Sequence, residues 1–191
     1  MGVKYRNIYT ITKRLFLYPD LAWLEVIKST DTFKSFLRNY LFAVAMVSGG
    51  VVFLIHLLQN HYLQAIGLAI LCFISCICSS WLAFLLAREY MCRKLCYSER
   101  EVLALVGYSH AIFFIFYSIG QAWNGMFIGQ IFMLLSFSFF RTLYQGIKQL
   151  ENYQPQHLSN VLIVFALAII FMPMIMNQIL RIVFGVSVIH V

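Results

Sequence analysis

The sequence has 191 residues, of which 62% are hydrophobic and only 11% are charged. Soluble domains are about one-quarter charged, so this chain lacks the polar surface of a soluble protein, and we expect a single integral membrane domain. The formal net charge of +7 would suit nucleic acid, but no nucleic-acid-binding motif is present, so we expect no such partner.

The first 38 residues are too polar to span a membrane and too apolar to form a disordered tail. After Pro19, the stretch DLAWLEVIKS places an aliphatic stripe on one helical face: Leu21, Leu24 and Ile27. Trp23 and Tyr18 are residue types that favour the headgroup region. We predict that residues 1–38 are a cytoplasmic amphipathic segment. Its helix either lies on the anionic leaflet or packs under the bundle.

Five apolar segments are long enough to cross the hydrocarbon core, which takes about 20 helical residues. They lie at roughly residues 40–58, 63–87, 102–120, 124–141 and 160–181. The connections QNHY (59–62) and QAWN (121–124) are very short. The expected fold class is therefore all-α, a polytopic membrane bundle of five transmembrane helices over residues 39–191.

The charges predict the orientation of the bundle. All but one of the 14 basic residues lie before span one, between spans two and three, or between spans four and five, and so do all 7 acidic residues. By the positive-inside rule, the N-terminus is cytoplasmic and the C-terminus is outside. The exception is Arg181, at the far end of span five.

The sequence lacks the residue patterns of common enzymes and metal sites. Nucleophilic catalysis needs a nucleophile and a base, whereas the spans contain serines but no carboxylate. Ser98 and Glu101 have the spacing of a helix capping box, which indicates a structural role. Cys92 and Cys96 could share a helical face, but a zinc site takes about four ligands. We expect no enzymatic activity, no metal and no cofactor.

Span three contains the stretch LVGYSHAIFFIF (105–116), which is unusually polar at its centre. Small residues line one face, where another helix can approach closely: Ala104, Gly107, Ala111 and Ser118. Tyr108 and His110 flank this stripe, and Ser109 points away from it. At about 1.5 Å per residue, His110 lies about 13 Å beyond Glu101, near the bilayer centre. Two readings stay open: a neutral histidine bonded to a neighbouring helix, or a proton- or ligand-binding site.

Span five contains Pro173, followed by Asn177, Gln178 and Arg181. Proline can kink a helix, and broken polar helices line the binding sites of transporters. Alternatively, Arg181 snorkels to the outer interface while the two amides bond across helices. The candidate intramembrane polar site consists of Tyr108, His110, Asn177 and Arg181.

Three short motifs follow one another along the chain. Pro19 and Trp23 form a Pro-x-x-x-Trp pattern, Ser98–Glu101 precede LVGYS (105–109), and Leu-Tyr-Gln-Gly occupies positions 143–146. Together with the five spans, these motifs resemble the YIP family of Ypt/Rab-interacting membrane proteins and their bacterial relatives. The Tyr-Gly-Pro element of the eukaryotic trafficking members is absent, so the resemblance is to the bacterial-type branch. The positions that carry it are Pro19, Trp23, Tyr108, Ser109, Tyr144 and Gly146.

The resemblance implies a protein of the bacterial inner (plasma) membrane. The expected function is that of a non-enzymatic scaffold, or a membrane-organising, trafficking-like factor, acting through the cytoplasmic face formed by residues 1–38 and 88–101. The expected partners are the lipid bilayer and a protein at that face. The alternative is a small channel or carrier, alone or as a homo-oligomer, with a polar pathway near His110 and Arg181.

Overall fold

The computed structural model describes residues 3–29, 32–59, 62–123, 126–151 and 153–184. Within these ranges the chain forms helices and no strands, and five helical stretches are long and apolar enough to cross a membrane. The predicted all-α fold with five spans is confirmed. Asp31, Asn124 and the C-terminal residues 185–191 lie outside the described residues.

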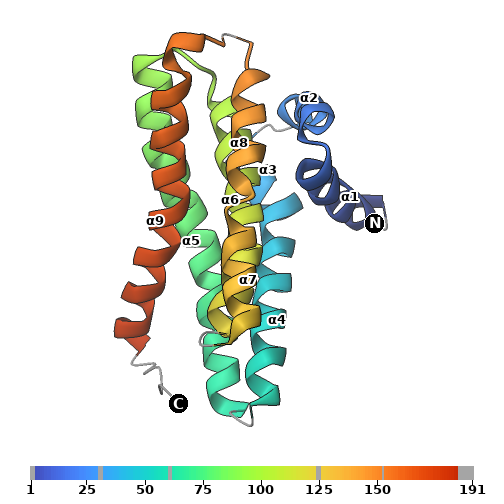
Figure 1. Ribbon diagram of the computed structural model, residues 1–191. Helices are drawn as coiled ribbons and strands as arrows, with labels where there is room; N and C mark the ends of the chain where they lie inside the picture. Colours follow the sequence, from blue (N-terminus) through green and yellow to red (C-terminus); the bar gives the residue numbers. More distant parts are fainter. Residues whose placement is uncertain (1–2, 30–31, 60–61, 124–125, 152, 185–191) are drawn as a thin grey trace.

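The five spans form an upright bundle (Figure 1). The first comprises α3 (Phe33–Phe36), the π-helical turn η1 (Leu37–Leu41) and α4 (Phe42–Leu58), and the second and third are α5 (Tyr62–Lys94) and α6 (Glu99–Ala122). The fourth comprises α7 (Phe127–Ser136) and α8 (Phe139–Lys148), and the fifth the 3-10 turn η2 (Pro155–His157) and α9 (Leu158–Phe184). Several helices run past the predicted ends, because a helix can continue into water after its apolar part ends.

Helix α6 lies at the centre of the bundle and contacts α4, α5, α7, α8 and α9. Every residue from Glu101 to Phe114 is buried. The apolar window of α6 has a mean hydropathy of 1.9, which is below the values of the first, second and fifth spans and above the 1.3 of the fourth. Small residues let its neighbours approach closely. At Gly107, an added Cβ would lie 2.6 Å from Phe36 Cζ.

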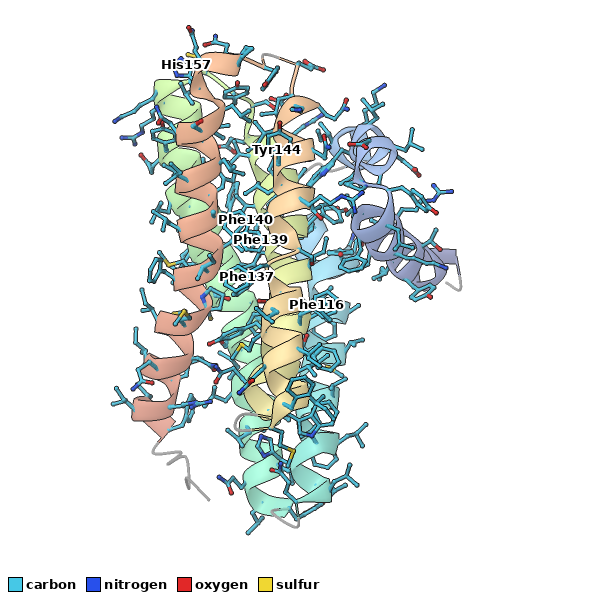
Figure 2. The ribbon with its side chains drawn as sticks, viewed as in Figure 1. Phe116, Phe137, Phe139, Phe140, Tyr144 and His157 are labelled. Atoms are coloured by element: carbon cyan, nitrogen blue, oxygen red, sulfur yellow. The ribbon has the colours of Figure 1, made fainter. Side chains whose placement is uncertain are left out.

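Aromatic side chains join the fourth span to α6. Figure 2 shows Phe137, Phe139 and Phe140 following one another where α7 gives way to α8. Phe139 is fully buried, and its ring meets that of Phe113 edge to face at 5.4 Å. Edge-to-face pairs of this kind add about 0.5–1.5 kcal/mol to the burial of their area. The junction is therefore anchored in the core although the helix is interrupted there.

The N-terminal residues form a helical hairpin, α1 (Val3–Leu17) and α2 (Pro19–Ser29). Figure 1 shows this hairpin in blue against the side of the bundle. Helix α2 packs on α8 and α6. An exposed ion pair of 3.2 Å joins Arg14 of α1 to Glu25 of α2.

Charged side chains gather at one end of the bundle, where α5 and α8 end and where α6 and α9 begin. We call this the charged end, the upper end in Figure 1. Arg88 pairs with Glu99 at 3.5 Å, and Arg93 pairs with Glu89 at 2.8 Å. The opposite end holds the connection from α4 to α5 and the end of α9. This separation agrees with the charge pattern, and the assignment of the charged end to the cytoplasm stays a prediction.

Candidate functional sites at the two ends of the bundle

Trp23 fixes the N-terminal hairpin to the bundle. We expected this residue in the headgroup region, but its side chain is fully buried. The indole Nε1 donates a hydrogen bond of 2.8 Å to the carbonyl oxygen of Thr142 in α8. Its ring meets Tyr108 of α6 edge to face at 6.3 Å. Because the hydrogen bond satisfies the one polar group of the indole, Trp23 can be buried and anchors α2 to the bundle.

Gly146 makes room for the indole. A Cβ at this position would lie 2.6 Å from Cε2 of Trp23 and 2.6 Å from Cδ2 of Leu105. Any larger residue would push α2 or α6 away from α8. One turn earlier, the Thr142 hydroxyl donates a hydrogen bond of 3.3 Å to the carbonyl oxygen of Leu15, at the end of α1. We call the contacts of Trp23 with Tyr108, Thr142 and Gly146 the Trp23 clamp.

Residues from the three family-like motifs meet in this clamp. Trp23, Tyr108 and Gly146 come from the first, second and third motif, and Trp23 contacts each of the other two. Ser109 is buried elsewhere on α6, and its Oγ has no hydrogen-bond partner among the described residues. Tyr144 lies on the outer part of α8, where Nζ of Lys148 is 4.3 Å from its ring centroid (Figure 2).

The outward side of the hairpin carries exposed apolar and basic residues together with two exposed acidic residues, Asp20 and Glu25. The side that faces the bundle comprises Ala22, Trp23 and Val26. Leu21 and Leu24, from the predicted stripe, face away from the bundle with exposed fractions of 77% and 51%. We define the hairpin face as the exposed residues Tyr9, Lys13, Arg14, Leu17, Tyr18, Leu21, Leu24 and Lys28.

A hollow lies within the hairpin face. It has a volume of about 270 Å³ and is lined by Arg14, Tyr18, Leu21 and Ala22. A cation, a phenol and aliphatic carbon thus surround one surface depression. Since the Arg14–Glu25 pair is exposed, it holds the guanidinium only weakly.

The predicted capping box at the start of α6 is confirmed. Glu101 Oε2 accepts hydrogen bonds from the backbone N–H of Ser98 at 3.0 Å and from its hydroxyl at 2.7 Å. The other carboxylate oxygen accepts from the N–H of Glu151 at 3.1 Å, which ties down the connection between α8 and α9. Nearby, burial raises the pKa of Tyr97, whose side chain is also hydrogen-bonded to the backbone of Gln154. These contacts make the charged end rigid.

His110 forms a buried contact between helices. Its Nε2 lies 2.9 Å from Oγ of Ser79 in α5, and the residue is fully buried. Because the Ser79 hydroxyl donates to the carbonyl of Ser75 at 2.5 Å, Nε2 is assigned the proton and Nδ1 is the acceptor. Nδ1 has no partner within the described part of the chain. The geometry matches the first of the two readings of His110, a neutral histidine bonded to a neighbouring helix.

A cavity of about 40 Å³ with a mixed apolar and polar lining lies at the opposite end, between α4, α5, α6 and α9. Its polar lining comprises His56, Tyr117, Ser118, Gln121, Asn177 and Arg181. The hydroxyl of Tyr117 is hydrogen-bonded to Asn177, which joins α6 to α9. Asn177 thus bonds across helices as one reading predicted, whereas Gln178 is exposed. Arg181 lines the cavity, and its Nε is buried rather than exposed at the outer interface.

The structure divides the predicted intramembrane site. Asn177 and Arg181 share the cavity, but neither Tyr108 nor His110 lines it. Phe114 lines the cavity and stacks on His110 at 5.7 Å, so its ring separates the two. Tyr108 belongs to the Trp23 clamp. Sequence reasoning missed Tyr117 and Gln121, although their four-residue spacing repeats that of Asn177 and Arg181.

The small-residue stripe of α6 is buried but is not one contact surface. Ala104 and Ala111 are fully buried, and Gly107 faces Phe36. Ser118 lines the cavity and donates a hydrogen bond of 3.0 Å to the carbonyl of Ile115. Because α6 is enclosed by other helices, residues outside the stripe are buried as well.

Over the described ranges, no group of three or more His, Cys, Asp or Glu side chains is placed to hold a metal ion. Cys92 is half-buried and Cys96 is exposed. No family model, no curated protein and no solved structure matches the chain. The resemblance to the YIP family therefore stays a prediction.

Proposed function

We propose that this integral membrane protein is of the YIP type and organises the bilayer without enzymatic turnover. In this proposal the hairpin face rests on the anionic cytoplasmic leaflet. The observation that supports it is the Trp23 clamp, which holds α2 so that Leu21 and Leu24 point outward while Trp23 and Val26 point inward. A clamped hairpin loses little additional freedom when it meets a surface.

The chemistry of the hairpin face favours an anionic lipid surface as its occupant. Aliphatic and aromatic side chains gain free energy when they leave water, and each basic residue near an anionic leaflet contributes about 1 kcal/mol. Lys13, Arg14 and Lys28 lie beside the apolar residues and outnumber the exposed acidic residues Asp20 and Glu25. This combination is typical of interfacial helices.

A channel or carrier is less well supported by the geometry. Its proposed pathway would have to join His110 to Arg181, and the stacked ring of Phe114 lies between them. Among the described residues, the imidazole of His110 makes its polar contact with Ser79 alone. We therefore treat the cavity as a separate feature.

The proposal can be tested by lipid association in liposomes that contain phosphatidylglycerol and phosphatidylcholine. The full chain is reconstituted, and spin-labelled lipids report which headgroup is enriched beside the protein. We expect enrichment of phosphatidylglycerol. The triple variant Lys13→Gln, Arg14→Gln, Lys28→Gln should largely abolish it, since three charges at about 1 kcal/mol each contribute about 3 kcal/mol together.

The matched control removes three exposed charges from the charged end but not from the hairpin face: Arg93→Gln, Lys94→Gln and Arg100→Gln. This variant should retain most of the enrichment. Equal losses in the two variants would indicate a general charge effect. No enrichment in the unmodified protein would favour a protein partner on the hairpin face, and either result would contradict the proposal.

A further inference from the structure

Arg181 is a cation without an anionic partner. It forms no ion pair with any described residue, and its Nε is buried without a hydrogen-bond partner. Within the described part of the chain, the acidic side chains lie on α2, near the end of α5, at the start of α6 or just after α8, away from the end that carries Arg181. An arginine stays charged in proteins, and a charge removed from water is costly unless it is paired.

The surroundings of Arg181 supply further hydrogen-bond donors. The amides of Asn177 and Gln121 and the hydroxyl of Tyr117 line the same cavity. These groups come from α6 and α9, and the bond between Tyr117 and Asn177 keeps the two helices together. A carboxylate-free cavity with a cation and several neutral donors is complementary to an anion.

We propose that this cavity binds the oxyanion of a phosphate group. The free Nε and an adjacent guanidinium N–H form a planar fork, and that fork matches two oxygens of one phosphate. The cavity of about 40 Å³ has room for about three waters, at about 10–15 Å³ each. It therefore accepts the anionic group, while the remainder of a larger ligand stays outside.

The phosphate can come from a free ion or from the headgroup of a phospholipid in the outer leaflet. Both present the same oxygens to Arg181, so the chemistry of the site is shared. This inference does not depend on the function proposed for the hairpin face, which lies against the side of the bundle and away from the end that carries Arg181. Different residues carry the two proposals, and either can fail alone.

The test uses the full chain in two arms. In the first arm, the chain in micelles of the phosphate-free detergent dodecyl maltoside is titrated with inorganic phosphate, and binding is measured by equilibrium dialysis. The second arm uses nanodiscs that include phosphatidylglycerol, and co-purifying lipid is counted by native mass spectrometry. Arg181→Gln should weaken binding about tenfold or more in the arm that binds, through loss of a charge-assisted bidentate contact.

Arg141→Gln is the matched control, because Arg141 is exposed on α8 and does not line the cavity. It should bind as the unmodified protein does. Arg181→Lys keeps the charge but loses the fork, so it should bind more weakly than the unmodified protein even if Arg181→Gln does not fold. Saturable binding in one arm identifies the source of the phosphate. The proposal is overturned by absence of saturable binding in both arms, or by full binding in Arg181→Lys.

Discussion

At the scale of single residues, the docking of the hairpin depends on close complementarity between an indole and a glycine. Trp23 and Thr142 are 119 positions apart in the chain and are joined by a hydrogen bond. Gly146 lies under the ring because only a residue without Cβ leaves enough space. A small change at this position should therefore loosen α2, although the same methyl would also press on Leu105 of α6.

We predict that Gly146→Ala increases hydrogen exchange in α2 because the added methyl would overlap the indole. Mass spectrometry of the amides of residues 19–29 measures this. Gly50→Ala is the control, since a Cβ at Gly50 meets nothing within 4 Å; it should leave α2 protected and gain about 0.5–1 kcal/mol of helix propensity. Unchanged protection in Gly146→Ala would contradict the clamp.

A second residue-scale prediction concerns the contact between Ser79 and His110. In a double-mutant cycle of Ser79→Ala and His110→Leu, we expect a coupling of roughly 0.5–2 kcal/mol in the free energy of unfolding, the range of hydrogen bonds between membrane helices. Ser109→Ala removes a buried hydroxyl without a partner and should not be destabilising. A coupling of zero would show that the contact contributes nothing to stability.

At the scale of helices, hydropathy and capping chemistry were sufficient to predict the five spans and the start of α6. They were not sufficient to orient α2. Its sequence has apolar residues on two faces, one with Leu21 and Leu24 and one with Trp23 and Val26. Only the partner surface of Gly146 and Thr142 decides which face is buried, and no local pattern encodes that.

The cavity was predictable only in part for a similar reason. Asn177 and Arg181 drew attention because polar residues are rare in a span. Tyr117 is amphipathic and resembles an ordinary interfacial residue. Gln121 falls in the predicted connection QAWN (121–124), although in the structure it belongs to α6. Their role follows from the packing of α6 against α9, which depends on contacts distant in sequence.

The capping box gives the element-scale prediction. Glu101→Ala should destabilise the fold by about 1–3 kcal/mol, because the carboxylate accepts hydrogen bonds from the backbone N–H groups of Ser98 and Glu151. Thermal unfolding in detergent measures the loss. Glu99→Ala is the control and should change stability by no more than about 0.5 kcal/mol, since its ion pair is exposed. Equal effects would argue against a special role of Glu101.

At the scale of the whole molecule, one end carries nearly all of the charge and the other carries Arg181. This asymmetry predicts that the charged end faces the cytoplasm. Cys96 is exposed at that end. A membrane-impermeant maleimide should therefore label it in everted vesicles and not in intact cells.

The control for this labelling is Gln59→Cys in a Cys96→Ser background. Gln59 follows α4 at the opposite end. The maleimide should therefore label this cysteine in intact cells and not in everted vesicles. Labelling of Cys96 in intact cells would show that the charged end faces outward, which contradicts the predicted orientation. It would also place the hairpin on the wrong leaflet for the proposed function.

The depth of α2 tests the central claim most directly. A spin label at Leu21→Cys, in a background without other reactive cysteines, is examined by power saturation in liposomes that contain phosphatidylglycerol. We expect the label to collide more often with oxygen, which concentrates in lipid, than with a water-soluble nickel chelate. In the Gly146→Ala variant we expect the opposite preference. A label that is as accessible to the chelate as a free peptide, in the protein with Gly146 intact, would contradict it.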